Sequence, residues 1–448
     1  MKEIELVGAA SQLGELSPSL LQAAPNEAAA ILLCHTHDTP TGQRRVLVRE
    51  VLHIPQQFYL EQRPDRVSIN PIFLAYAFRR AREEESSILL AHTHPFARWP
   101  EFSPIDDHGE ARLIPVVFGR VEKRPHGSLV LGEEGFSARL YSRPDCVQAI
   151  KSMVSIGRDL WRNTKDDPSV PSDSMHDRNV RAFGAGQQKL QRMRVGIVGL
   201  GGMGSLIAEQ LAHLGVGALT LVDFDKLETS NLNRVVGASR EDVGAPKVEV
   251  AERLIHRINP GIVVEPLHGS ILKESIARRL LDCDLVFCCT DSHGSRAVIN
   301  QLSYQYLVPV IDTGVRIDAL GGRITSMVGR VQLLSPDLPC LSCSGLLDPQ
   351  QIRRDFLSDA ERKLDPYITG HSEPQPAVVS INGVVASLAV TMFLSVVAGV
   401  PIAGRHLLYL VGESVLRRIG VDRASNCVVC SARGAYARAD DWQMIWQP

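Results

Sequence analysis

The chain has 448 residues, of which 44% are hydrophobic and 22% charged, and its formal net charge is −2. This length predicts two or three domains, and the small charge gives no global attraction to nucleic acid or to an anionic membrane. No basic start leads into an apolar run, so we expect no secretory signal. Nine cysteines, an odd number, argue against a disulfide framework and favour a reducing, cytoplasmic setting.

Residues 1–141 read as a first domain of mixed α and β structure. Apolar runs bounded by turn residues predict strands over 28–35, 44–55, 87–94, 115–121, 127–132 and 136–141. An amphipathic pattern predicts a helix over 70–86. The chain then turns polar, and a stretch rich in Asp, Ser and Pro over 162–178 favours a linker at 142–177, with a short helix around 147–160.

Residues 178–448 read as a second domain. Strands are expected at 194–200, 218–225, 284–290 and 308–314, with a helix at 203–215. Near-continuous apolar strands that alternate with helices are typical of an α/β fold with a doubly wound, mostly parallel sheet.

Residues 377–404 contain no charged side chain, and the segment is long enough to cross a bilayer as a helix. The segment also contains serines, an asparagine and a threonine, and it lacks an aromatic belt or a basic flank. These features favour a helix buried against the sheet, with membrane insertion as the alternative.

The tripeptide His-Thr-His occurs twice, at 35–37 and 92–94. Two histidines spaced i, i+2 at a strand end point to one side and suit chelation, but a catalytic zinc needs a third ligand. The second copy is followed by Ser103 and Asp106 in the pattern H-T-H-x8-S-x-x-D, and Glu27 opens an earlier strand. The first copy has no S-x-x-D after it and reads as part of a turn, so we expect solvated loop histidines there.

Glu27, the second tripeptide and the S-x-x-D pattern resemble the JAMM/MPN metalloprotease motif, over about residues 1–141. Known members of that family include isopeptidases that remove ubiquitin-like proteins. The resemblance implies that a catalytic zinc is bound by His92, His94 and Asp106. It also implies that Glu27 is the general base and that Ser103 stabilises the oxyanion. The alternative is a degenerate, metal-free fold kept for binding.

A glycine-rich turn at 199–204 follows a strand and opens a helix, as a phosphate-binding loop requires. Its glycines are Gly199, Gly201, Gly202 and Gly204. Alone, this loop would equally fit an NAD-dependent dehydrogenase. Asp223 ends the next strand, where a carboxylate can bind ribose hydroxyls, and further polar residues follow in order: Asp225, Asn231, Arg234, Lys247 and Asp291.

The motifs G-x-G-G-x-G, D-x-D-x4-S-N-L-x-R, V-G-x-x-K and T-D resemble the ThiF/MoeB family, the adenylating core of ubiquitin-activating enzymes, over about 178–434. The resemblance implies that a C-terminal carboxylate attacks the α-phosphate of ATP, giving an acyl-adenylate and pyrophosphate. It implies that Asp223 binds ribose, with Asp225 in the same nucleotide site. Asn231, Arg234 and Lys247 would contact the triphosphate, and Asp291 would hold Mg²⁺. The S-N-L-x-R motif has no role in a dehydrogenase.

Two further features belong to the same resemblance. Arg181 matches an arginine that family members insert into a partner subunit's site, which implies a homodimer; the alternative is a surface arginine. The pairs Cys340-x-x-Cys343 and Cys427-x-x-Cys430 together fit one structural zinc. The alternative for these pairs is a redox dithiol.

Many ubiquitin-activating relatives have a catalytic cysteine shortly before the last long helix, but residues 365–385 contain none here. Cys288 and Cys289 lie in an apolar strand and read as inert core thiols, with Cys283 beside it. We therefore expect direct transfer of the acyl-adenylate to an external nucleophile, either a conjugating enzyme's cysteine or a sulfur donor.

Together the two halves predict a bifunctional enzyme that processes and activates a ubiquitin-like protein. Such fusions resemble those in prokaryotic operons with ubiquitin-like and conjugating proteins, some of them linked to antiphage defence. One alternative is an activator of a sulfur carrier for cysteine, thiamine or molybdopterin supply. Another is a binding scaffold whose two sites have decayed.

Overall fold

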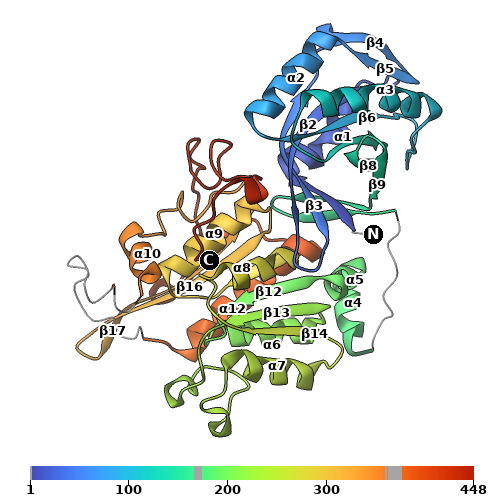
Figure 1. Ribbon diagram of the computed structural model, residues 1–448. Coiled ribbons are helices and arrows are strands. Elements are labelled where there is room, and N and C mark those ends of the chain that lie inside the picture. The colour runs from blue at the N-terminus through green and yellow to red at the C-terminus, as the bar shows by residue number, and fades with distance from the viewer. Residues whose placement is uncertain (1–2, 166–173, 359–360, 362–375, 448) are drawn as a thin grey trace. The chain divides into compact units, whose positions relative to one another are not determined.

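The computed structural model describes residues 3–165, 174–358, 361 and 376–447. The chain forms two compact units (Figure 1). The first unit contains residues 1–168, 305–307 and 435–443, and the second contains 169–304, 308–434 and 444–448. The expectation of a mixed α/β fold is confirmed in both units.

The first unit is built on a nine-stranded sheet of order β11-β10-β1-β3-β2-β6-β7-β8-β9. Its strands are β1 (Ile4–Ala9), β2 (Ala29–Asp38), β3 (Arg44–His53), β6 (Ser87–Thr93), β7 (His126–Leu131), β8 (Phe136–Arg143), β9 (Cys146–Ile150), β10 (Ser152–Ile156) and β11 (Leu160–Asn163). A separate hairpin consists of β4 (Tyr59–Arg63) and β5 (Arg66–Ile69). The helices are α1 (Glu15–Leu21), α2 (Pro71–Glu83) and α3 (Pro104–Arg120).

Strand β2 lies at the centre of this sheet and is buried on both faces. Leu32 and Cys34 join one apolar cluster, whereas Ile31 and Leu33 join the other. Since successive side chains of a strand alternate between faces, two cores require a continuous apolar run, which is what the sequence contains. The strand thereby fixes the position of Glu27, two residues before its start.

Two sequence-based predictions in this unit are wrong. Residues 146–163 form three strands of the sheet, so the predicted linker at 142–177 and its helix around 147–160 do not exist over those residues. Residues 115–120 belong to α3 instead of a strand. In α3, Ser103 caps the helix start and Ile114 and Val117 are buried on one face, which outweighs the strand preference of the β-branched residues.

The first His-Thr-His tripeptide is also not a solvated loop. Strand β2 continues to Asp38, and His35 and His37 are 0% and 3% exposed. The short helix η8 (Ala439–Asp441), in the C-terminal segment 435–443, packs on β2 within this unit. His35 forms a hydrogen bond with Asp441, and the ring of His37 packs edge-on against Tyr306.

The second unit contains an eight-stranded sheet of order β14-β13-β12-β15-β16-β17-β18-β19. The strands are β12 (Arg194–Val198), β13 (Ala218–Asp223), β14 (Val263–His268), β15 (Leu285–Cys288), β16 (Val310–Leu320), β17 (Arg323–Leu334), β18 (His406–Leu410) and β19 (Val415–Arg418). The first five in the spatial order are parallel and the remaining pairs are antiparallel. The expected doubly wound sheet is confirmed.

Helices cover both faces of this sheet. They are α4 (Asp177–Phe183), α5 (Ala185–Arg192), α6 (Gly204–Leu214), α7 (Lys247–Ile258), α8 (Glu274–Ala277), α9 (His293–Gln305), α10 (Pro349–Phe356) and α12 (Val379–Ala398). The apolar helix α12 is long enough to cross a membrane, but here it packs on β16, β17 and α6 (Figure 1). The strand order reverses between β12 and β15, and ligands bind at such switch points in doubly wound folds.

Candidate functional site

The second His-Thr-His tripeptide lies at the end of β6, next to the start of α3. Nε2 of His92 is 3.0 Å from Oδ1 of Asp106, and Nε2 of His94 is 3.2 Å from Oδ2 of the same carboxylate. Thr93, between the two histidines, points the other way and is fully buried. Its hydroxyl accepts a hydrogen bond from the backbone of Ala28 at 2.9 Å, which holds the start of β2 beside the site.

The start of α3 orients Asp106. The hydroxyl of Ser103 accepts a hydrogen bond from the backbone N–H of Asp106 at 3.2 Å, and the Asp106 carboxylate accepts one from the Ser103 backbone at 2.6 Å. This reciprocal capping box fixes both side chains at the helix end. Burial would raise the pKa of Asp106, but hydrogen bonds from His92 and His94 outweigh burial and lower it.

Glu27 approaches the same point from β2. Its Oε1 lies 3.7 Å from Nε2 of His94, and its side chain is 5% exposed. Burial raises the pKa of Glu27 to about 7, against the opposing charges of His92 and His94.

The three ligand atoms of His92, His94 and Asp106 lie within 4.8 Å of one another. Two imidazole nitrogens and one carboxylate oxygen form a donor set that suits zinc and leaves a fourth position open. The residues present therefore fit a catalytic zinc, with Glu27 beside it.

In the second unit, the glycine-rich loop joins β12 to α6 at the switch point. Gly199 has a positive φ of 90°, and a Cβ there would lie 2.9 Å from the carbonyl oxygen of Cys289. A Cβ on Gly204 would lie 1.8 Å from the carbonyl oxygen of Gly199. By contrast, a Cβ on Gly201 would meet no atom of the described residues within 4 Å. The loop is thus tightly packed at its ends and open in the middle, where a phosphate can approach the helix start.

Asp223 ends β13 and holds this loop. Its Oδ2 accepts a hydrogen bond from the backbone of Leu200 at 2.6 Å, and its Oδ1 accepts one from Asp225 at 2.8 Å. Nζ of Lys247 lies 2.7 Å from Oδ2 of Asp225. Burial raises the pKa of Asp223, and the nearby ammonium of Lys247 opposes that rise.

The remaining predicted residues of this site are placed as follows. Arg234 lies beside the loop, because a Cβ on Gly202 would be 3.1 Å from its side chain. Asn231 is 7% exposed in the short helix η4 (Thr229–Asn231), and its Oδ1 accepts a hydrogen bond from the backbone of Glu228. Asp291 is exposed just after β15, on the other side of the switch point. Arg181 is exposed on α4, and its insertion into a partner subunit stays a prediction.

Sequence reasoning missed one residue of this site. Asn382 of α12 is 6% exposed, and its Nδ2 lies 2.5 Å from the place of a Cβ on Gly202. The signal was available, since Asn382 is the only asparagine in the apolar segment 377–404.

The two C-x-x-C pairs converge. Sγ of Cys340 is 3.6 Å from Sγ of Cys427, and Sγ of Cys343 is 3.6 Å from Sγ of Cys430. Four thiolates at the usual Zn–S distance of about 2.3 Å, in a tetrahedron, would be about 3.8 Å apart. Hydrogen bonds, first from Cys430, lower the pKa of Cys340 to about 5. The donor set therefore fits a structural zinc.

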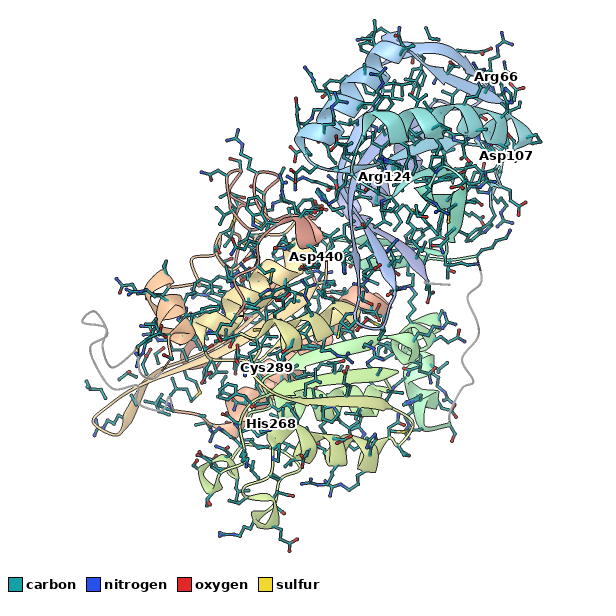
Figure 2. The ribbon with its side chains drawn as sticks, in the orientation of Figure 1. Arg66, Asp107, Arg124, His268, Cys289 and Asp440 are labelled. Atoms are coloured by element: carbon teal, nitrogen blue, oxygen red, sulfur yellow. The ribbon has the colours of Figure 1, made fainter. Side chains whose placement is uncertain are left out.

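Of the three other cysteines of this unit, two are core thiols and the third, Cys289, is partly exposed. Cys283 and Cys288 are fully buried, and Figure 2 shows Cys289 at the end of β15, inside the second unit. Burial raises the pKa of Cys289 to about 12 and that of Cys288 well above its usual value. Of residues 365–385, where the sequence resemblance led us to look for a catalytic cysteine, 365–375 lie outside the described residues.

Two family models match the two halves of the chain separately. Residues 9–141 match the family model described as prokaryotic homologs of the JAB domain, and residues 176–429 match that of the ThiF family. The molybdopterin-synthase adenylyltransferase of Escherichia coli is 32% identical over 248 residues, which cover 55% of this chain and 90% of the relative.

Two further relatives match the same half. The SAMP-activating enzyme E1 of Haloferax volcanii is 34% identical over 158 residues, covering 35% of this chain and 55% of the relative. The sulfur carrier protein adenylyltransferase of Thermus thermophilus is 30% identical over 251 residues, covering 55% and 84%. Since the ThiF match spans more than half of the chain, this protein belongs to the ThiF family, with a JAB domain at its N-terminal end.

Proposed function

We propose that the two units act on the C-terminal tail of one ubiquitin-like protein. The ThiF half adenylates the tail's carboxylate, and the JAB half is a zinc isopeptidase that trims a precursor or removes the protein from a conjugate. The proposed isopeptidase activity rests on one observation: His92, His94 and Asp106 converge beside the buried carboxylate of Glu27. A fold kept only for binding would not need this donor set.

In the JAB half, a bound zinc ion would polarise the carbonyl group of the bond to be cleaved and would lower the pKa of the attacking water. Glu27, beside the ligand His94, would take the proton from the attacking water and deliver it to the leaving amine. Ser103, fixed by the capping box, would donate to the oxyanion through its hydroxyl.

In the ThiF half, the tail carboxylate attacks the α-phosphate of ATP and pyrophosphate leaves. Lys247, Arg234 and Asn231 would neutralise and orient the phosphates, together with the open loop at Gly201. Asp223 would bind ribose and Asp291 would hold Mg²⁺. Arg181 would complete the site of a second copy in a homodimer, and the reduced thiols suit the cytoplasm.

The acyl-adenylate would pass directly to an external nucleophile, such as the cysteine of a conjugating enzyme. The burial of Cys283 and Cys288 supports this route, because an inaccessible thiol cannot attack. Cys289 is partly exposed, but desolvation raises the pKa of its thiol to about 12, which disfavours the reactive thiolate. Covalent tethering of the two activities would raise the local concentration of the trimmed tail at the second site. The pathway would be a prokaryotic ubiquitin-like modification, with antiphage defence as its proposed setting.

A second candidate is the activation of a sulfur carrier. It is favoured by the names of two relatives, the molybdopterin-synthase adenylyltransferase and the sulfur carrier protein adenylyltransferase. Here the external nucleophile would be a sulfur donor, and a thiocarboxylate on the carrier would distinguish it from a conjugate.

The test is mass spectrometry of a candidate carrier incubated with ATP, Mg²⁺, zinc and the full-length protein. With a precursor of the carrier, trimming should vanish in Glu27→Ala and persist in Asp223→Ala. With the mature carrier, the adenylate should vanish in Asp223→Ala and persist in Glu27→Ala. Absence of both products with every ubiquitin-like or sulfur-carrier candidate would contradict the proposal and favour a decayed scaffold.

A further inference from the structure

The second unit contains a pocket of about 500 Å³ that none of the predicted residues lines. It lies over β16, β17 and β18, on the face of the sheet opposite α12. Gly329 faces α12, because a Cβ there would lie 2.4 Å from Val385, whereas the neighbouring Arg330 faces the pocket. The lining includes three arginines, one acid and two leucines: Arg296, Arg316, Arg330, Asp318, Leu346 and Leu408.

The arginines outnumber the carboxylates available to them. Asp312, which is fully buried, accepts a hydrogen bond from Nη2 of Arg330 and lies 3.5 Å from Nε of Arg296. Two guanidinium groups therefore share one carboxylate. Arg316 pairs with Asp318 at 2.9 Å, which leaves the group with one net positive charge.

Two details indicate that this positive charge is available to bind a ligand. Nη1 of Arg330 is buried and has no hydrogen-bond acceptor in the part of the chain that the structure describes. Gly314 places no side chain over the two largely buried guanidinium groups, and a Cβ there would lie 3.3 Å from Nη2 of Arg296 and 3.4 Å from Nη2 of Arg330. The neighbouring His406 adds no charge at neutral pH, because burial and Arg330 lower its pKa to about 4.

A guanidinium group of this kind favours a carboxylate, which it binds with two parallel hydrogen bonds. The half-buried Leu346, Leu408 and Val328 add apolar contact for the stem of a side chain or for a peptide backbone. The volume is in the range of ordinary ligand sites.

The position of the pocket relates it to the adenylation site. Arg296 is five residues after Asp291 in the chain, and Asp312 pairs with Cys288 across β15 and β16. From β12, which leads into the glycine loop, to β17 there are three strand steps of about 4.8 Å, or about 14 Å. An extended peptide covers this distance with about four residues.

We propose that this pocket binds an acidic side chain, Asp or Glu, in the extended tail of the carrier protein, about four residues before the carboxylate that is adenylated. This inference rests on the proposed adenylation function and adds a specificity determinant to it. The pocket would select carriers by their tail sequence before the chemistry begins.

The test uses the full-length protein with ATP and Mg²⁺ and synthetic eight-residue peptides that end in Gly-Gly. In one series Glu occupies each of the first six positions in turn, and in the matched series Gln replaces it. Fluorescence polarisation should show one position near the fourth from the end where Glu binds about tenfold more tightly than Gln.

Gly314→Val, which fills the pocket, should remove this preference, and Arg316→Gln should reduce it. Arg323→Gln, on the same hairpin but outside the pocket lining, should leave it unchanged. ATP binding should be equal in all variants, which shows that the fold is intact.

Equal affinities for Glu and Gln at every position, no measurable binding of any Glu peptide, or a preference that survives Gly314→Val would each overturn the pocket assignment. The adenylation function is judged separately by pyrophosphate exchange with a whole carrier protein. Exchange without a Glu preference would leave that function standing and contradict only the pocket.

Discussion

Nδ1 of His35 lies 2.7 Å from Oδ2 of Asp441, although 406 residues separate them in the chain. Asp441 also accepts a hydrogen bond from Lys123, and the guanidinium of Arg49 donates one to the carbonyl of Tyr436. These contacts all lie within the first unit. The segment 435–443 therefore supplies acceptors to buried donors of β2 and β3, and the JAB domain depends on the far end of the chain.

Asp441→Asn should destabilise the first unit by about 1–2 kcal/mol, because it weakens hydrogen bonds to His35 and to the Lys123 ammonium. Faster hydrogen exchange of the amides in β2 is the expected readout. The control is Asp422→Asn, at an exposed aspartate of the second unit. If β2 is protected equally in wild type and Asp441→Asn, the segment does not stabilise the strand.

The first unit should lose stability in mild acid because of His126. Burial lowers the pKa of this histidine from 6.5 to about 4, so between these values the unfolded chain binds a proton that the folded chain does not. Stability therefore falls as pH decreases from 6.5 to 4, by about 3 kcal/mol for this group.

His126→Asn should flatten the decrease of Tm over this pH range, since Asn can still accept the hydrogen bond that Nδ1 receives from the backbone of Ile88. The exposed His53 provides the control, His53→Asn. An unchanged slope in His126→Asn would show that other groups cause the acid sensitivity.

Both candidate sites could be found from the sequence because their residues follow strand ends at short spacings. His92 and His94 flank one buried threonine, and Asp106 follows soon afterwards in the capping box of Ser103, so these three ligands are close in the chain. Glu27 reaches the site instead through a long-range contact, the pairing of β2 with β6. The glycines of the nucleotide loop are likewise close in the chain, within residues 199–204.

The sequence-based predictions that were wrong concern residues with long-range contacts or strands at the edges of the sheet. His35 and His37 look like loop residues because their neighbours Asp441 and Tyr306 are hundreds of residues away in the chain. Strands β9 and β11 are short and half exposed at the two edges of the sheet, and β11 runs into the polar stretch 162–178 that reads as a linker. The arginine pocket depends on the register between β16 and β17, which no local pattern specifies.

We expect two zinc ions per chain, one at each cluster. His94→Gln should reduce the content to one ion and leave the Tm of the second unit unchanged, because it removes a ligand only from the JAB site. Cys343→Ser should also reduce the content to one but lower that Tm, since a structural zinc contributes to folding. Native mass spectrometry measures both. Retention of two ions in His94→Gln would contradict the catalytic zinc.

Two glycines of the nucleotide loop should differ sharply when replaced by alanine. Gly204→Ala places a methyl group 1.8 Å from the carbonyl oxygen of Gly199, so the loop must move and Tm should decrease. The methyl group of Gly201→Ala meets no atom within 4 Å in the described part of the chain, so Tm should be unchanged while the affinity for ATP decreases at least tenfold. Calorimetry and ATP titration test the pair. Unchanged ATP affinity in Gly201→Ala would show that phosphates do not approach there.

Single replacement of Cys283, Cys288 or Cys289 by serine should leave onward transfer of the carrier unchanged. With a pKa of about 12, the Cys289 thiol is ionised to only about one part in 10⁵ at neutral pH, and the thiolate is the nucleophile. Cys283 and Cys288 are fully buried and cannot reach an acyl-adenylate. The measurement is the rate of transfer from ATP-activated carrier to an added thiol, followed by non-reducing gels and intact-mass spectrometry. A carrier thioester on this chain that disappears with one of these replacements would refute direct transfer.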